Sequence, residues 1–167
     1  MNISSNEKEV MKLLLSNARA TDTKISHQIG LSTTGVGKIR KKLESRGLIE
    51  KYGVELDIEA LGLNVLTVVH YRVLANAWKA HGEGVNKLLA SSHNCVGCIR
   101  LQGGGATHLV MYVFSDVHSA ESYLNAVQSE LYDYLEVGEV SHLLVHDILK
   151  NDTSGLVASA LEMEEEA

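Results

Sequence analysis

The spacing of apolar residues changes in character near residue 62. Before that point, apolar side chains recur every three or four positions in three short segments, 5–17, 23–29 and 33–46, as they do in amphipathic helices. After it come stretches rich in β-branched and aromatic residues, separated by two further segments with helical spacing. One sequence therefore predicts two modules, an all-helical one first and a mixed sheet-and-helix one second.

The first module carries start and stop signals for its helices. Ser4 and Glu7 form a capping-box pattern at the start of the first helix. Gly30 allows a tight turn before the third helix, because glycine adopts positive φ without steric cost. Ser32 is a suitable N-cap for that third helix, and Gly47 is a suitable residue to end it.

Residues 48–56 predict two short strands that turn near Gly53. Three helices followed by such a hairpin make a winged helix-turn-helix, in which one helix enters the major groove of DNA. The distribution of charge along the chain agrees with a DNA-binding first module. Residues 1–53 carry ten Lys and Arg against five Asp and Glu, and residues 54–167 carry five against sixteen, so the net charge of −6 divides into +5 and −11. Such asymmetry indicates a nucleic-acid module, although a merely solvated acidic half is the alternative.

The third predicted helix has two chemically different sides. Val36, Ile39 and Leu43 form an apolar stripe, and the opposite side carries hydroxyl and ammonium groups suited to phosphates and guanine edges. Its N-terminal amides also favour phosphate. The expected DNA-binding residues are Ser32, Thr33, Thr34, Gly37, Lys38, Lys41 and Lys42, with Lys51 on the wing.

Three residues of the same helix need a separate explanation. Arg40 lies beside the apolar stripe, so we expect it to brace the domain rather than contact bases. Gly35 and Gly37 each cost about 1 kcal/mol of helix propensity relative to alanine. Either they let the backbone approach DNA closely, or they let the helix order only on binding.

The second module predicts the element order βαββαβ, which is the ferredoxin-like arrangement. The expected strands are 63–74, 94–101, 107–115 and 139–150, and the expected helices are 76–91 and 117–135. We expect the odd-numbered strand residues to pack under the helices. The even-numbered residues, such as Val68 and Tyr112, are also largely apolar. A large exposed apolar face usually marks an interface, so the sequence predicts a homodimer joined sheet to sheet.

The overall expectation is an α+β chain with four parts. They are a winged helix-turn-helix DNA-binding domain at 1–55, a linker at 56–62, a ferredoxin-like dimerisation and effector domain at 63–150, and an acidic tail at 151–167. Poor order is favoured for the tail, and a short terminal helix is the alternative. No apolar run approaches the 18 residues of a membrane span, and the N-terminus lacks a signal-peptide pattern. A cytoplasmic protein with no membrane partner is expected.

With these two modules in this order, the sequence resembles the Lrp/AsnC (feast/famine) family of transcription regulators. The resemblance is carried by Ile25–Ser32, Val36, Leu43-Glu44, Gly47–Ile49, Leu56-Asp57 and Leu61-Gly62. It extends over residues 5–150 and implies a C-terminal domain of the RAM type. It also implies dimers, often assembled into larger rings such as octamers, and small effectors such as amino acids bound near the interfaces of that domain.

The chain departs from the family at two places. The family commonly has Arg-Ile where this chain has Ile39-Arg40. Its hairpin between the second and third strands usually has Gly followed shortly by Asp, whereas this chain has Gly103, Gly104 and Gly105 followed by Ala and Thr107. With no carboxylate to meet an ammonium group, ordinary amino-acid sensing is in doubt. The hairpin amides, with Thr107, are the expected effector site, for an anionic group.

Cysteine and histidine offer weaker candidates. Cys95 and Cys98 form a lone CxxC in a predicted strand, where residues three apart face opposite sides. Core or edge cysteines are therefore the simpler interpretation, and a redox or metal role is the alternative. Four histidines fall on even-numbered positions of the predicted sheet: His70, His108, His142 and His146. Of these, His70, His142 and His146 are candidate metal ligands, and hydrogen-bonded interface histidines are the alternative.

The sequence thus favours a dimeric or larger, sequence-specific DNA-binding transcription regulator that responds to a small effector. The alternative is a metal- or redox-sensing protein that binds small molecules through the His and Cys residues of its second module. No nucleophile–base pair and no phosphate-binding loop is evident, so an enzyme is not expected and no cofactor is expected.

Overall fold

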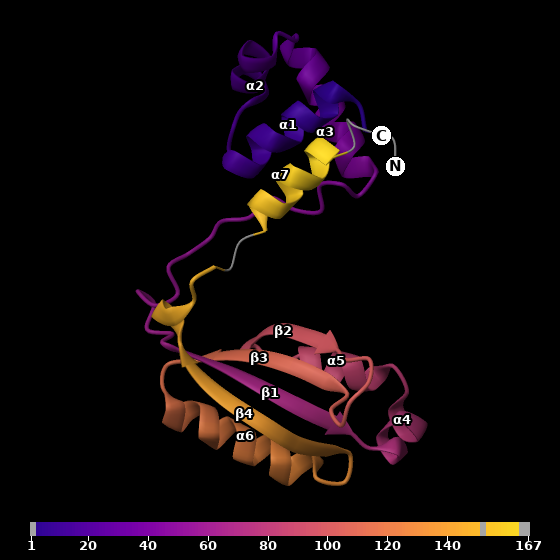
Figure 1. Cartoon of the computed structure of the whole chain (residues 1–167), viewed down its shortest axis with the longest axis vertical. Helices are drawn as coiled ribbons and strands as arrows, with labels where there is room; N and C mark the ends of the chain where they lie inside the picture. Colours follow the sequence, from indigo (N-terminus) through magenta and orange to yellow (C-terminus); the bar gives the residue numbers. More distant parts are fainter. Residues whose placement is uncertain (1–2, 151–152, 164–167) are drawn as a thin grey trace. The chain divides into compact units, whose positions relative to one another are not determined.

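The computed structural model describes residues 3–150 and 153–163, and it divides the chain into two compact units. The first unit contains residues 1–55 together with residues 150–167, and the second contains residues 56–149 (Figure 1). The last segment of the chain therefore belongs to the N-terminal unit, which the sequence pattern did not indicate. Among the described residues, no helix is long and apolar enough to span a membrane.

The three N-terminal helices form where the local signals predict them. They are α1 (Ser5–Ser16), α2 (Asp22–Ile29) and α3 (Thr33–Ser45). The capping box is complete, because the backbone N–H of Glu7 donates to Ser4 Oγ and the backbone N–H of Ser4 donates to Glu7 Oε2 at 2.8 Å. Gly30 and Gly47 both have φ of 69°, the left-handed conformation that ends α2 and follows α3.

Apolar residues from all three helices meet in the core of the first unit. Val10, Ile25, Val36 and Leu43 are fully buried there. Burial of each such side chain contributes about 1.5–3 kcal/mol, which exceeds what helix propensity alone gives segments this short. The stripe of α3 is therefore what fixes that helix in the domain.

The predicted two-stranded wing is not present. Residues 50–56 form no strand, although the backbone there is described. Leu48 and Ile49 pack against the core, but Val54 and Leu56 are exposed. A two-stranded hairpin by itself is marginally stable, and no further strand among the described residues of this unit pairs with residues 50–56.

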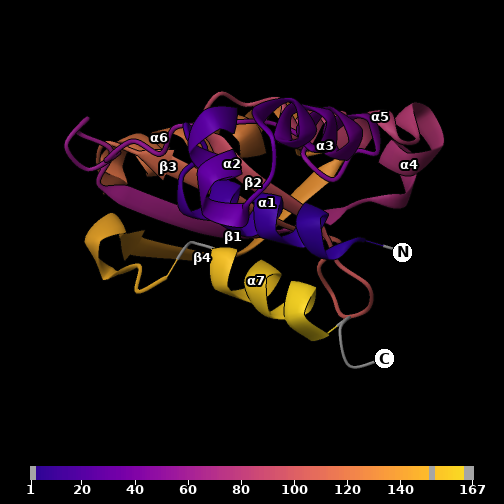
Figure 2. The ribbon, with the colours of Figure 1, turned by 90° about the horizontal axis from the view of Figure 1, so that it is seen from above.

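The expected disorder after residue 150 is also wrong for most of that segment. Residues Ser154–Met163 form a helix, α7, which lies along α1 (Figures 1 and 2). Leu161 is 7% exposed and packs in the same core as Val10 and Leu14. Glu162 Oε1 lies 3.5 Å from Lys12 Nζ. The acidic end, residues 164–167, lies outside the described residues.

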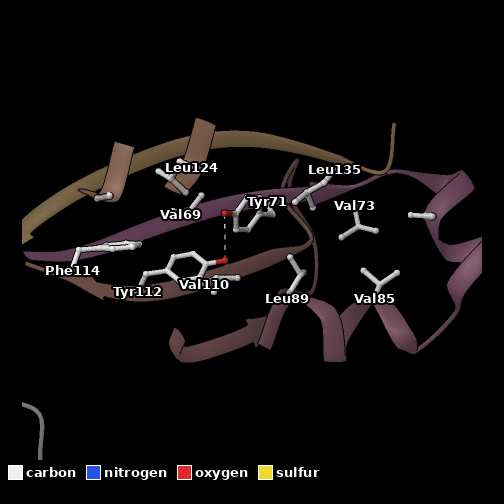
Figure 3. Packing of buried hydrophobic residues seen from close by; sticks show 12 residues of the cluster. Val69, Tyr71, Val73, Val85, Leu89, Val110, Tyr112, Phe114, Leu124 and Leu135 are labelled. Atoms are coloured by element: carbon white, nitrogen blue, oxygen red, sulfur yellow. Dashed lines mark hydrogen bonds between the residues drawn. The ribbon is translucent and has the colours of Figure 1, made fainter. Parts of the chain in front are cut away.

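The second unit has the predicted βαββαβ order. Its strands are β1 (Val65–Val73), β2 (Cys95–Arg100), β3 (His108–Phe114) and β4 (Leu135–Leu144), and they form one antiparallel sheet in the order β2-β3-β1-β4. Its helices are α4 (Ala75–His81), α5 (Gly84–Ala90) and α6 (Val117–Leu131). They pack on one face of the sheet around a core that contains Val69, Tyr71, Val110 and Tyr112 (Figure 3).

Two boundaries in this unit differ from the prediction. The helix expected at 76–91 is broken into α4 and α5 at Gly82, whose φ of 51° no helix allows. The last strand begins at Leu135 and ends at Leu144, and a short 3-10 turn, η1 (Val145–Asp147), follows it. The prediction of a strand at 139–150 therefore placed its start four residues too late, and residues 145–150 are not part of the strand.

The assignment of residues to the two sheet faces was wrong for β3, and also for Leu143 of β4, which pairs with Leu66 on the uncovered face. Odd-numbered residues of β1 face the helices, but Val65 pairs with Phe114 and Val69 pairs with Val110, so even-numbered residues of β3 share that face. Residue parity has no meaning across a connection, because register depends on how many residues the connection contains. The hydroxyls of Tyr71 and Tyr112 consequently meet inside the core at 3.4 Å (Figure 3).

Candidate nucleic-acid interface

Helix α3 presents a row of polar side chains opposite its buried stripe. Thr34, Lys38 and Lys41 are exposed and follow one another at intervals of four and three residues, which places them on one side of the helix. Neither Lys38 nor Lys41 forms an ion pair within residues 3–150 and 153–163. We call these three residues the basic face of α3.

The hydroxyl groups at the start of α3 have structural partners. Ser32 Oγ accepts a hydrogen bond from the backbone N–H of Gly35 at 3.0 Å, so it caps the helix. Thr33 Oγ1 lies 3.3 Å from Ser26 Oγ and joins α3 to α2. Of the hydroxyl residues expected to contact DNA, Thr34 is therefore the one that the described contacts leave exposed and without a side-chain hydrogen bond.

Arg40 braces the domain, as its position beside the apolar stripe predicted. Its Nε donates to Asp22 Oδ1 at 2.8 Å, and its Nη2 donates to the carbonyl of Ala20 at 2.9 Å. The guanidinium also lies over the ring of Tyr52, 5.7 Å from the ring centre. Arg40 thus ties α3 to the start of α2 and to the segment that follows α3.

Lys42 also has a partner inside the unit. Its Nζ lies 3.0 Å from Oε1 of Glu7, whose side chain is 3% exposed, and Arg46 Nη1 lies 3.0 Å from the same oxygen. The hydrogen bond from the Ser4 backbone, followed by the one from Lys42, lowers the pKa of Glu7 to about 2. No local sequence signal indicates this cluster, because Glu7 and Arg46 are separated by 39 positions.

The two glycines of α3 have close neighbours within the domain. A Cβ on Gly37 would lie 3.1 Å from Asp22 Oδ2, and a Cβ on Gly35 would lie 3.1 Å from Ser32 Oγ. Gly37 therefore allows α2 to approach α3 and places Asp22 where Arg40 binds it. Its backbone position faces α2, which gives an intramolecular reason for a glycine there. Lys51, the remaining predicted contact, is exposed in the extended segment after α3.

The predicted effector residues lie at the turn between β2 and β3. Gly103 and Gly104 have φ of 92° and 83°, and a side chain on either would meet only open space. Thr107 is different. Its Oγ1 accepts from the backbone N–H of Val73 at 2.9 Å and lies 3.2 Å from the carbonyl oxygen of Tyr71. The Thr107 hydroxyl holds the hairpin against β1 and is already occupied.

The four histidines do not gather on one face. His108 is buried among the helices, where its Nε2 donates to Asn86 Oδ1 at 2.9 Å. His142 Nδ1 lies 3.0 Å from Oγ1 of Thr67, on the helix side of the sheet, whereas His70 occupies the opposite side of β1. His146 lies in η1, 3.5 Å from Glu59. The described part of the chain contains no group of three side chains able to hold a metal ion.

The two cysteines lie on the same face, contrary to the expectation from simple alternation. A β-bulge between Cys95 and Gly97 shifts the register, so Cys95 pairs with Tyr112 and Cys98 with Val110. Both thiols are free and partly buried against the core. Burial, and then the neighbouring Cys95, raises the pKa of Cys98, which favours the protonated and less reactive thiol.

Comparison with known sequences identifies the N-terminal module. Residues 3–50 match a family model described as winged helix-turn-helix DNA-binding. The HTH-type transcriptional regulator LrpA of Pyrococcus horikoshii is 33% identical over 66 residues, which are 40% of this chain and 47% of that protein. The chain thus spans about half the length of the curated relatives it matches.

Solved structures show the same fold over nearly the whole chain. LrpC of B. subtilis has a TM-score of 0.72 at 20% identity and covers 92% of this chain and 99% of its own. A transcriptional regulator from Neisseria meningitidis, solved as a complex with L-Met, has a TM-score of 0.75 at 19% identity, with 92% and 96% covered. The relatives from Pyrococcus horikoshii and Neisseria meningitidis are named as transcriptional regulators. Residues 3–50 thus match winged helix-turn-helix DNA-binding domains, and the chain has the fold of these solved structures.

Proposed function

We propose that this protein regulates transcription by binding double-stranded DNA through the basic face of α3. The observation that carries the proposal is the state of Lys38 and Lys41, which are exposed and form no ion pair among the described residues, on a helix whose other side buries Val36 and Leu43. A rigid helix with free ammonium groups on its outer side is suited to the major groove. The regulatory activity of the whole protein, its DNA target site and its partners are all proposed here together with the binding mode.

Ion pairing divides the cations of α3 and of the segment that follows it into two groups. Arg40, Lys42 and Arg46 are bound to Asp22 or Glu7 and hold the helices together. Lys38, Lys41 and Lys51 are exposed, and these are the cations we assign to phosphates or bases. Thr34 and the N-terminal amides of α3 add hydrogen-bond donors for phosphate.

We further propose that the protein is a homodimer joined through the uncovered face of its sheet. The face opposite α4, α5 and α6 carries partly or fully exposed apolar side chains from all four strands: Leu66, Val68, Ile99, Leu109, Met111 and Leu143. Apolar surface of this kind usually marks an interface. A two-fold axis through the sheets would pair two α3 helices, as a palindromic site requires. Octamers built from such dimers are the larger assembly to test by sedimentation.

The turn between β2 and β3 remains our proposed site for an anionic group of an effector. Its segment, residues 101–107, contains no carboxylate, and the glycines at 103–105 leave their amides accessible. Backbone amides in such turns bind anions. This proposal uses Gly103, Gly104 and Gly105, because the Thr107 hydroxyl has other partners.

Selection of bound DNA from a random pool, followed by affinity measurement at several salt concentrations, tests the proposal. We expect the double variant Lys38→Ala/Lys41→Ala to bind at least about tenfold more weakly and to lower the salt slope by about 2. The matched control is Lys79→Ala/Lys87→Ala, which removes two exposed lysines of the second unit. Unchanged affinity in the first variant, or equal loss in both, would contradict the assignment to α3.

A further inference from the structure

The helical layer of the second unit contains an apolar pocket of about 510 Å³, between α4–α5 and the junction of α6 with β4. Its inner wall is formed by Ala77, Val85, Leu89 and Leu135, all of which are buried. Leu88, which is 53% exposed, and Tyr134 lie at its edge. Figure 3 shows Val85 and Leu89 on the helix side and Leu135 on the sheet side of this region.

The break in the predicted helix 76–91 explains why the space is open. Gly82 ends α4, and α5 begins again at Gly84, which has no side chain to direct into the gap. A Cβ on Gly84 would meet only the Cβ of His81, at 4.0 Å. Ala77, on the preceding helix, has only a methyl side chain. A continuous helix with larger residues at these two positions would fill the volume.

The chemistry of the wall defines what it can bind. No Asp, Glu, Lys or Arg is among the residues that line the pocket, and its polar side chains are the imidazole of His81 and the hydroxyl of Tyr134. These two rings stack edge to face at 5.2 Å and close one side. A ligand charge placed against this wall would have no partner, and burial of an unpaired charge is strongly unfavourable.

We infer that this pocket binds an uncharged, mainly apolar small molecule, aromatic or aliphatic, with a single hydrogen-bonding group for His81 or Tyr134. The volume lies within the range of about 300–1,000 Å³ typical of small-molecule sites. Apolar cavities in proteins stay dry and accept ligands of this type. The wall disfavours a free amino acid, because it offers no Asp, Glu, Lys or Arg side chain to pair with the ammonium and carboxylate. Binding itself is independent of the proposed function, but any effect of the ligand on DNA affinity rests on it.

Titration of 2-naphthol and 1-octanol into the full chain tests the inference. Trp78 is the sole tryptophan of the sequence and follows Ala77 on α4, so its fluorescence reports on α4 next to the pocket. We expect saturable binding of 1-octanol by fluorescence and of both probes by calorimetry, with a negative heat-capacity change. L-methionine should bind this pocket at least about tenfold more weakly than 2-naphthol or 1-octanol, because it carries two charges.

Gly84→Leu gives the decisive comparison. The new side chain enters the pocket without meeting a neighbour at its Cβ, and replacing a helical glycine favours folding, so the variant should be at least as stable as the parent. We expect it to weaken probe binding at least about tenfold, in line with the loss of the apolar contacts. Lys87→Leu adds the same side chain on the same helix outside the pocket and should leave probe binding unchanged.

Two results would overturn the inference. One is that neither probe binds the parent saturably, or that the probes bind Gly84→Leu and the parent equally well. The other is a change in oligomer size on Leu88→Asp without probe binding by the parent, which would show that a second copy of the chain covers the pocket. DNA affinity measured on the same variants is expected to be unchanged without ligand. If the parent protein binds DNA but neither probe, the inference about the pocket fails while the proposed function stands.

Discussion

Arg46 Nη1 lies 3.0 Å from Glu7 Oε1, so the C-terminal cap of α3 is tied to the first turn of α1. Glu7 also completes the capping box of α1 and binds Lys42. One buried carboxylate therefore connects the start of the first helix to the end of the helix that carries the basic face. The orientation of α3 within the unit depends on this carboxylate as well as on the apolar stripe.

Replacement of Glu7 by Gln should destabilise the first unit by about 2 kcal/mol, because the buried carboxylate loses its charge-assisted hydrogen bonds to Lys42 and Arg46. Denaturant unfolding followed by far-UV circular dichroism measures the change. Glu9→Gln is the control, since Glu9 is exposed and its carboxylate lies 3.4 Å from Lys12 Nζ at the surface. We expect less than about 0.5 kcal/mol from that variant. Equal effects of the two substitutions would contradict the central role of Glu7.

The stability of the protein should also depend on pH through Glu7. Its pKa is about 2 in the folded chain and 4.5 in the reference state, so the unfolded chain takes up the proton first as the pH falls. The stabilisation from Glu7 is complete above about pH 4.5 and is lost progressively between that pH and about pH 2. Unfolding of the parent and of Glu7→Gln should accordingly differ most near neutral pH. Their stabilities should converge at the acidic end, and a constant difference would be the contrary result.

His108 should add a second pH dependence at higher pH. Burial, and then the charge of Arg100, lowers the pKa of His108 below its ordinary value of 6.5. The unfolded chain therefore binds this proton more readily than the folded one. Stability from the neutral imidazole is complete above about pH 6.5 and declines as the pH falls below it.

Thermal unfolding of the parent and of His108→Gln between pH 7.5 and 5.5 measures the contribution of His108 to the pH dependence of stability. We expect the melting temperature of the parent to fall more steeply with acidification than that of the variant. His93→Gln provides the matched control, because His93 is exposed, and its profile should follow the parent. Parallel profiles for the parent and His108→Gln would show that His108 does not contribute.

Helix α7 gives a prediction about the end of the chain. Leu161→Ala should destabilise the first unit by about 2–3 kcal/mol, the usual cost of removing a buried leucine side chain. Leu156→Ala is the comparison, because Leu156 lies on the same helix and is 71% exposed. Hydrogen exchange of α1 amides locates the effect, and the amides of the β1–β4 sheet should be unaffected. Faster exchange in the sheet, or no effect in α1, would contradict the packing of α7 on α1.

Local signals were sufficient for much of the fold. Ser4 with Glu7, Ser32 and Gly47 define helix ends through contacts within a few residues, so the predicted ends of α1 and α3 agree with the structure. The βαββαβ order follows from apolar periods within each segment. The same local approach failed at Gly82, where a glycine breaks the helix, and at residues 50–56, where strands lack a partner.

The sequence by itself determined the helix-turn-helix, the order of strands and helices, and the position of the cations along α3, because each depends on spacing within one element. Tertiary structure alone decided which of those cations are free. Lys42 binds Glu7 and Lys38 does not, although both are lysines on the same helix. Face assignments were decided in the same way, since strand register and the bulge at Cys95 depend on partners far along the chain. Contacts between distant residues are set by packing, which no pattern within a single segment encodes.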